Sequence, residues 1–204
     1  MKEYSVAIFG AGIIGSNIFN SLVLSGLSCV LVEKENDVSL GATKANSGII
    51  HAGYDAKTGT LKAKYNVRGN KMYEKLAKRL GEKIIPCGSF VVGREEDLPA
   101  LKVLLERGKN NGVKNLEILD STTLHKMEPN LKKDINYALF SKDAKIISPY
   151  HFCISLVNEG VINGGDLLLN FNTTKIERVG EKYVILSSDG RSFEADFIIN
   201  CAGA

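Results

Sequence analysis

Three glycines near the start of the chain have the spacing of a phosphate-binding turn. Gly10, Gly12 and Gly15 form the pattern G-x-G-x-x-G directly after an apolar run and before a helical pattern. Gly10 permits a tight turn, Gly12 lets the main chain come close to a pyrophosphate, and Gly15 lets the helix lie against the strand. Main-chain N–H groups and the positive end of the helix dipole would then face the phosphates. The pattern therefore predicts a dinucleotide site.

A carboxylate lies at the position where dinucleotide-binding units bind the ribose hydroxyls. Glu33 ends the second apolar run, at about the 20-residue spacing that such units use. A carboxylate there accepts hydrogen bonds from ribose hydroxyls and repels a 2′-phosphate, which disfavours NADP and leaves NAD and FAD open. An interpretation of the glycines as turn and contact residues alone is disfavoured, because strand, helix, strand and Glu33 occur in register.

Hydrophobic spacing indicates the elements that must position these residues. Residues 4–9 form a short apolar run, Ile14, Ile18 and Leu22 then recur at helical spacing, and residues 28–32 are apolar again. This is a strand, helix, strand unit. Further helices are expected at residues 60–80 (capped by Thr60), 97–107, 122–127 and 148–159, and strands at 87–93, 117–119, 167–170, 174–179, 183–187 and 197–201, with a hairpin turn at Asp189-Gly190 before a further short strand.

Composition excludes several classes of protein. The chain has 204 residues, of which 44% are hydrophobic and 24% charged, with a formal net charge of +3, so a globular protein without a nucleic-acid footprint is expected. No apolar run reaches the roughly 20 residues of a membrane span, and we expect a cytoplasmic protein. The cysteines and histidines lack metal-ligand spacing, which predicts reduced thiols and no metal site: Cys29, Cys87, Cys153, Cys201, His51, His125 and His151.

The segment after Glu33 favours FAD over NAD. It reads GATKANSGIIHAGYDAKTGTLKAKYNVRGN (residues 41–70), whose small and polar residues would make a poor strand and a good surface for a flat ligand. This segment resembles the flavin-facing part of the FAD-dependent oxidoreductase superfamily that includes D-amino-acid oxidase and sarcosine oxidase. Within that superfamily, NSGIIHAGYD and GTLKAKYNVRGN are most similar to anaerobic-type glycerol-3-phosphate dehydrogenases and L-2-hydroxyglutarate dehydrogenases.

The resemblance extends along the whole chain. LHKMEPNL, SKDAKIISPYHFCISLVNE and LNFNTTKIERV follow in the family's order, and the final ADFIINCAGA resembles its second flavin fingerprint. The resemblance implies an α/β fold, with a Rossmann-like FAD-binding domain of the GR2 type and an inserted, incomplete α+β substrate domain. Residues 1–80 and 145–204 would form the FAD-binding domain, discontinuous and incomplete, and residues 81–144 part of the substrate domain.

The resemblance also implies FAD as the cofactor and a set of residues around it. The glycine turn would lie along the pyrophosphate, Glu33 would hold the adenosine ribose, and Lys34 would lie beside the adenine or ribose. Ala42 and Thr43 would meet the phosphates or the ribityl chain, and the main chain of Ile176 would meet adenine. Residues 46–48 would reach the isoalloxazine, with a polar turn as the alternative there. The expected cofactor-binding residues are Gly10, Gly12, Ile13, Ile14, Gly15, Glu33, Lys34, Ala42, Thr43, Asn46, Ser47, Gly48, Ile176, Cys201, Ala202 and Gly203.

The implied activity is oxidation of sn-glycerol 3-phosphate to dihydroxyacetone phosphate by hydride transfer to flavin. The alternatives are an FAD-dependent oxidoreductase of an L-2-hydroxy acid or an amine, and a non-catalytic cofactor-binding fragment or interaction module. His51 is the only histidine in the flavin-facing segment and the candidate base, although a histidine that only contacts the flavin remains the alternative. Lys44, Lys62 and Arg68 add positive charge, which favours a small anionic substrate.

Chains of this family run on past the second fingerprint, so we expect this chain to be a fragment or a subunit that is inactive alone. The sheet containing residues 87–92 and 137–140 would then have open edges, which predicts a homo-oligomer that covers them. An electron-acceptor protein or subunit is a further expected partner.

Overall fold

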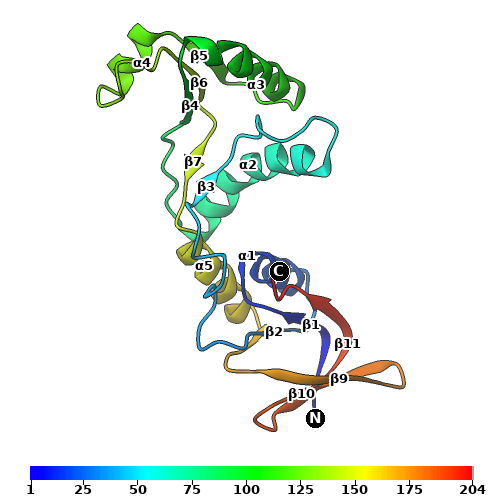
Figure 1. Cartoon of the computed structure of the whole chain (residues 1–204). Helices are drawn as coiled ribbons and strands as arrows, with labels where there is room; N and C mark the ends of the chain where they lie inside the picture. Colours follow the sequence, from blue (N-terminus) through cyan, green and yellow to red (C-terminus); the bar gives the residue numbers. More distant parts are fainter. Residues whose placement is uncertain (204) are drawn as a thin grey trace. The chain divides into compact units, whose positions relative to one another are not determined.

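The computed structural model describes residues 1–203, which form two compact units (Figure 1). Met1–Ser47 and the chain from Ser148 onward form the first unit, and Gly48–Ile147 forms the second. The assignment of residues 1–80 and 145–204 to the FAD-binding domain stays a prediction. Residues 48–80 belong to the second compact unit, in which Tyr54 and Val67 pack on the buried Val113 and Ala144.

The first unit contains a six-stranded sheet in the order β8, β2, β1, β11, β10, β9. Its strands are β1 (Lys2–Phe9), β2 (Cys29–Val32), β8 (Asp166–Leu168), β9 (Thr173–Val179), β10 (Lys182–Ser187) and β11 (Ser192–Asn200). The four strands β8, β2, β1 and β11 are parallel, whereas β10 and β9 are antiparallel. This parallel sheet with its helices confirms the predicted Rossmann-like α/β fold.

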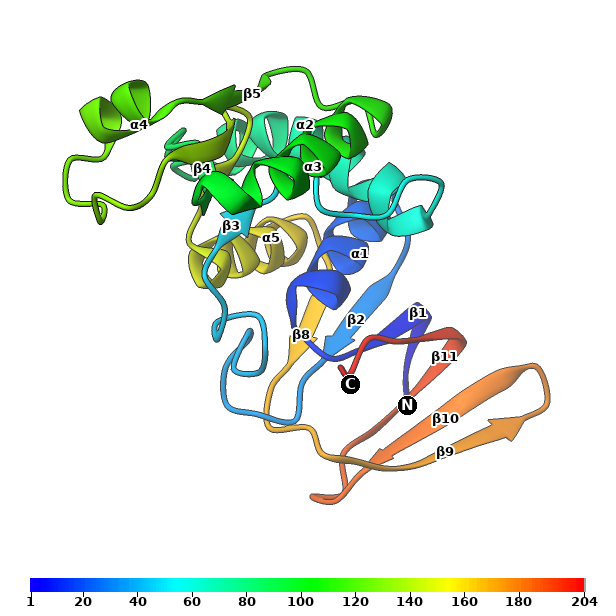
Figure 2. The same ribbon diagram turned by 45° about the horizontal axis from the view of Figure 1, so that its top comes forward.

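Both faces of the parallel strands are buried, which explains their continuous apolar runs. Successive side chains alternate: Val6, Ile8 and Leu31 face one cluster, and Ala7 and Val30 face the other. Helices α1 (Ile13–Leu24) and α5 (Pro149–Ile162) lie side by side on the first of these faces (Figure 2). The sheet is thereby held rigidly around the turn that carries the glycine pattern.

The contact between the two helices depends on close approach. A Cβ at Gly160 would lie 2.5 Å from the Phe19 ring, and one at Gly165 would meet the same ring at 2.5 Å. The Asn20 side chain crosses from α1 to α5 and donates to the carbonyl of Leu156 at 2.9 Å. None of the helices within residues 1–203 is long and apolar enough to cross a lipid bilayer.

One strand prediction was wrong. The expected short strand after Asp189-Gly190 and the expected strand at 197–201 are a single strand, β11, which pairs with β10 through its first half and with β1 along its length. The two halves look different in sequence because Glu194 and Asp196 interrupt the apolar residues. The turn itself is confirmed, since the Gly190 N–H donates to the carbonyl of Ser187 at 3.1 Å.

The second unit contains a three-stranded antiparallel sheet with β6 (Tyr137–Ser141) between β4 (Ser89–Gly93) and β5 (Leu116–Leu119). Strands β4 and β5 each have one neighbour within the described chain, whereas β6 is paired on both sides. A short pair of strands, β3 (Ile49–Ile50) and β7 (Lys145–Ile146), was not foreseen. The homo-oligomer expected from open edges stays a prediction.

The helices of the second unit follow the sequence signals. They are α2 (Leu61–Leu80), α3 (Leu98–Asn110) and α4 (Ser121–Met127), with a single 3₁₀ turn, η1 (Glu95–Asp97), before α3. Thr60 caps α2 as predicted, because its hydroxyl accepts the N–H of Ala63 at 3.2 Å. Gly81, at φ 71°, ends α2.

Candidate functional site

The glycine turn joins β1 to α1 and lies against the end of β11. The Gly10 N–H donates to Val32 at 2.7 Å, and the Cys201 N–H donates to Phe9 at 2.8 Å, so the ends of β2, β1 and β11 meet at the turn. Gly10 has φ +98°, and a Cβ there would lie 2.4 Å from the carbonyl oxygen of Cys201. Ligands of open α/β sheets bind at the carboxyl ends of neighbouring parallel strands, which is where this turn lies.

Gly15 allows close packing of α1 against the glycine turn and does not line the cleft. A Cβ at this position would lie 2.0 Å from the carbonyl oxygen of Gly10, so only glycine lets α1 begin this close to the turn. Gly12 is different, since a Cβ there would lie 3.1 Å from the Thr43 hydroxyl and otherwise has room. The predicted turn at Gly10 and the predicted helix contact at Gly15 therefore agree with their geometry, and the approach of Gly12 to a pyrophosphate stays a prediction.

Glu33 turns back from the end of β2 onto the glycine turn. Its Oε2 accepts the N–H of Ala11 at 2.8 Å, and its Oε1 accepts the N–H of Glu35 at 3.1 Å. Such charge-assisted bonds hold the carboxylate in one orientation beside the turn. Each oxygen has a remaining lone pair, which is the group that a ribose hydroxyl would use.

The loop after Glu33 closes the other side of the cleft. The Ile13 N–H, at the first turn of α1, donates to the Thr43 hydroxyl at 3.0 Å. The Asn46 amide donates to the carbonyl of Thr43 at 2.6 Å and so folds the loop on itself. Ser39 is buried at φ 65°, and its N–H donates to Ala11 at 2.9 Å. The loop is therefore attached to the glycine turn at two points.

These segments enclose a cleft of about 430 Å³, within the size range of ligand pockets. Twelve of the predicted cofactor residues line it: Gly10, Gly12, Ile13, Ile14, Glu33, Lys34, Ala42, Thr43, Asn46, Cys201, Ala202 and Gly203. Its lining includes many small residues and the N-terminus of α1. Of its two carboxylates, Glu33 and Glu35, Glu33 is the one that accepts two main-chain N–H groups. This lining fits a dinucleotide, whose pyrophosphate needs main-chain N–H groups and whose ribose needs an acceptor.

Four other predicted residues do not line this cleft. Gly15 is buried under the turn, and Ser47 lies just beyond the lining loop. Gly48 begins the second unit, where its carbonyl accepts the N–H of Ile147 at 3.0 Å. Ile176 lies within β9, paired with Ile185, and 42% of its surface is exposed. Their assignment to the cofactor site stays a prediction.

The sequence interpretation missed four lining residues, namely Glu35, Ser39, Leu40 and Gly41. The signal was present, since a loop that leaves the end of β2 next to β1 must pass the glycine turn. The hydrogen bond from the Ser39 N–H to the Ala11 carbonyl is a tertiary contact, however, and the hydrophobic period of the sequence does not predict it.

Two cysteines near the cleft have thiol pKa values that are raised by burial. Burial raises the pKa of the Cys201 thiol. Burial also raises the pKa of Cys153, which lies 3.1 Å from the Ser16 hydroxyl behind the turn. Burial therefore disfavours the thiolate, which is the nucleophilic form, at both positions.

The candidate catalytic residue and the predicted cations are not among the residues that line this cleft. His51 is exposed in the second unit, directly after β3. Lys62 lies 3.8 Å from Asp55, and Lys44 and Arg68 are exposed. The His125 ring lies 3.0 Å from the carbonyl of Ile135, a structural contact, and His151 is exposed on α5.

Together the parallel sheet, the glycine turn and the acidic strand end define a dinucleotide-binding fold of the flavoprotein type. Residues 5–204 match the family described as FAD dependent oxidoreductase, and the chain belongs to this family. FAD is the cofactor on which that family depends.

The chain is similar to enzymes of two substrate groups. It is 41% identical over 201 residues to the glycerol 3-phosphate dehydrogenase of Caloramator mitchellensis, covering 98% of this chain and 42% of that protein. It is 29% identical over 216 residues to the mitochondrial L-2-hydroxyglutarate dehydrogenase of Homo sapiens, covering 99% of this chain and 46% of that protein. The chain therefore spans somewhat less than half the length of these relatives.

Solved structures share the fold. The dithionite-reduced L-alpha-glycerophosphate oxidase from Mycoplasma pneumoniae, with FAD bound, superimposes with a TM-score of 0.91 at 27% identity, over 97% of this chain and 53% of that chain. A glycine oxidase from Geobacillus kaustophilus gives 0.88 at 21% identity, over 100% of this chain and 56% of that chain, and shows the fold alone.

Proposed function

We propose that the complete gene product is an FAD-dependent dehydrogenase that oxidises sn-glycerol 3-phosphate to dihydroxyacetone phosphate and passes the electrons to another acceptor. The observation that carries this choice is the 41% identity to a glycerol 3-phosphate dehydrogenase along 98% of the chain. The similarity to the human L-2-hydroxyglutarate dehydrogenase is lower, at 29%.

The first unit would hold the cofactor. Main-chain N–H groups at the start of α1 lack partners within the helix and are suited to the pyrophosphate. Glu33, held by the N–H groups of Ala11 and Glu35, would accept hydrogen bonds from the adenosine ribose. FAD held there would supply the acceptor for the hydride from the carbon that bears the hydroxyl group.

We assign His51 as the base that takes the proton of the substrate hydroxyl group. As the C–H bond yields a hydride, the O–H bond must lose a proton for the C=O bond to form, and a neutral imidazole is a suitable base. The ring is exposed, so a substrate can reach it. A small anionic substrate would be attracted by the lysines and arginine of the same segment, of which Lys44 and Arg68 are exposed.

Two alternatives are retained. L-2-hydroxyglutarate is an anionic 2-hydroxy acid whose oxidation has the same proton and hydride balance, and relatives with that activity cover 99% of the chain. A cofactor-binding module without turnover is the third hypothesis, and it predicts FAD binding with no reduction by any substrate.

The test is anaerobic mixing of the flavin-loaded gene product with sn-glycerol 3-phosphate, L-2-hydroxyglutarate and glycine in turn. We expect rapid loss of the oxidised-flavin absorbance with sn-glycerol 3-phosphate. Bleaching by L-2-hydroxyglutarate alone would select the second hypothesis, and bleaching by glycine alone would refute an alcohol substrate. His51→Asn should slow the reduction, whereas His151→Asn, an identical change at an exposed site on α5, should not.

A further inference from the structure

The ring of His51 has no hydrogen-bond partner among residues 1–203, so its position depends on the main chain that carries it. On its N-terminal side, Ile50 is paired with Lys145 in the short β3–β7 ladder. On its C-terminal side, the chain enters a loop from Gly53 to Thr60 that is outside any helix or strand. Loops of this kind are mobile unless other groups fix their carbonyls.

Asn70 holds the main chain at His51 itself and on its N-terminal side. It projects from α2 and is 7% exposed, and its amide nitrogen donates to the carbonyl of His51 at 3.1 Å and to that of Asp143 at 2.9 Å. The same nitrogen lies 3.4 Å from the carbonyl of Ile50. One buried side chain on α2 thus ties the main chain of His51 to the turn that precedes β7.

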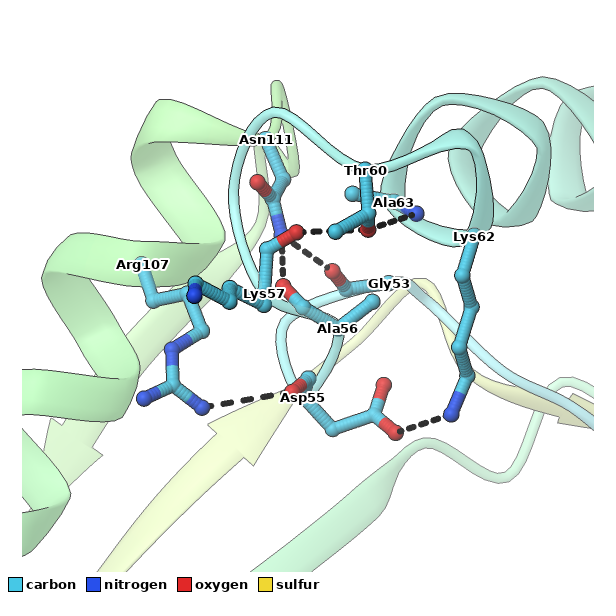
Figure 3. A network of polar contacts seen from close by, with 9 residues as sticks. All are labelled: Gly53, Asp55, Ala56, Lys57, Thr60, Lys62, Ala63, Arg107 and Asn111. Carbon is cyan, nitrogen blue, oxygen red and sulfur yellow. Dashed lines mark hydrogen bonds and ion pairs between the residues drawn. The ribbon is translucent and has the colours of Figure 1, made fainter.

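Asn111 holds the loop on the C-terminal side of His51, as Figure 3 shows. From the C-terminal end of α3, its amide nitrogen donates to the carbonyls of Gly53 at 2.9 Å and Ala56 at 2.7 Å. Its amide oxygen accepts the hydroxyl of Thr58 at 2.8 Å. All parts of one amide are therefore used to hold three points of the loop.

Neighbouring groups reinforce this attachment. Arg107, one turn earlier on α3, donates to the carbonyl of Asp55 at 3.2 Å, and Lys62 lies 3.8 Å from the carboxylate of the same residue (Figure 3). Gly53 has φ +106°, and a Cβ there would lie 2.6 Å from Val67, so the loop enters in a conformation that only glycine allows. The loop therefore has one defined path.

We infer that Asn111, together with Asn70, is a positioning residue for His51 in the proposed alcohol oxidation. The inference rests on the proposed function, because it concerns the base of that reaction. Both amides act on the main chain within a few residues of His51, and neither contacts the ring. A base that is displaced by about 1 Å from its proton can lose about 100-fold in rate, so this attachment matters for catalysis as well as for folding.

The test is a double-mutant cycle in the flavin-loaded gene product, with flavin reduction as the readout. Asn111→Asp keeps the size and the acceptor for Thr58 but removes the two donors to the loop. We expect flavin reduction to slow by ~10-fold or more in this variant. In the His51→Asn background the same change should have little further effect, because it acts through His51.

The matched control is Asn110→Asp, which adds the same charge one residue away at an exposed position. This control should reduce its flavin at the wild-type rate. A second readout is trypsin cleavage after Lys57, within the loop, which should be faster in Asn111→Asp than in the control. If Asn111→Asp fails to fold, Thr58→Val removes the donor to the Asn111 oxygen on an exposed side chain and carries the same cycle.

The outcomes separate the inference from the function on which it rests. Equal effects of Asn111→Asp with and without His51 would overturn the positioning role, as would wild-type reduction rates in Asn111→Asp. A wild-type protein that no substrate bleaches would refute the proposed function. A His51→Asn variant with the full rate would refute His51 as the base, and the positioning role with it.

Discussion

Replacing Gly10 by alanine should damage both folding and cofactor binding, because two separate costs meet at this residue. The first is conformational, since φ is +98° and an L-residue in the left-handed region costs about 1–2 kcal/mol. The second is steric: a Cβ would lie 2.4 Å from the Cys201 oxygen and 2.8 Å from the Ala202 Cα. Ordinary contacts are about 3.5–4.0 Å, so this main chain must move by about 1 Å.

The steric cost can be isolated with a matched control. Gly26 has φ +86°, but a Cβ there would meet nothing within 4 Å, so Gly26→Ala carries the conformational cost alone. Overpacking typically adds about 1–3 kcal/mol, which predicts a loss of about 2–5 kcal/mol for Gly10→Ala against about 1–2 kcal/mol for Gly26→Ala.

Urea unfolding followed by circular dichroism measures this difference, and FAD titration measures its consequence for the cleft. Because Cys201 and Ala202 line the cleft, we expect FAD to bind at least about 10-fold more weakly to Gly10→Ala, a change of about 1.4 kcal/mol. Gly26→Ala should bind FAD normally. Equal unfolding free energies for the two variants would refute the steric argument, and unchanged FAD affinity would refute the assignment of this cleft.

Three further predictions follow from individual contacts. Glu33→Gln should weaken FAD by about 1–3 kcal/mol, because both carboxylate oxygens accept main-chain N–H groups and an amide can accept at only one of them; an unchanged dissociation constant would contradict this. Iodoacetamide should label exposed Cys87 before Cys201, whose thiol pKa is raised by burial, and peptide mass spectrometry that finds the reverse order would be decisive against it. The hydrogen bond from the Thr123 N–H lowers the pKa of Asp120 from its ordinary value. The protein should therefore be more stable than Asp120→Asn at about pH 7, and this difference should be lost as the pH falls through the folded-state pKa of Asp120. Urea midpoints of the two proteins that differ by the same amount at neutral pH and below that pKa would disprove it.

Local sequence signals were enough to predict the glycine turn of the cofactor site. The order of strand, G-x-G-x-x-G and helix is encoded by neighbouring residues, and only glycine tolerates φ +98° at Gly10. The α2 cap at Thr60 could be predicted for the same reason, because the hydroxyl and the N–H of Ala63 are three residues apart. Helix and strand positions agreed wherever the apolar period was regular, as in α1 and β2.

Contacts between distant residues could be decided only by the tertiary structure. The sequence placed Glu33 in the site, but the folding of its carboxylate onto Ala11 depends on β1 and β2 being adjacent. Likewise, β11 is one strand because β1 pairs with it along its length, which outweighs the polar Glu194 and Asp196 in its middle. Asn70 and Asn111 have no local signal at all, since each binds main-chain carbonyls of segments that are remote in sequence and reach it only in the folded chain. Hydrogen bonds between remote segments form only after the chain has lost the conformational entropy of loop closure. Which groups become partners therefore depends on how the core packs and not on neighbouring residues in the sequence.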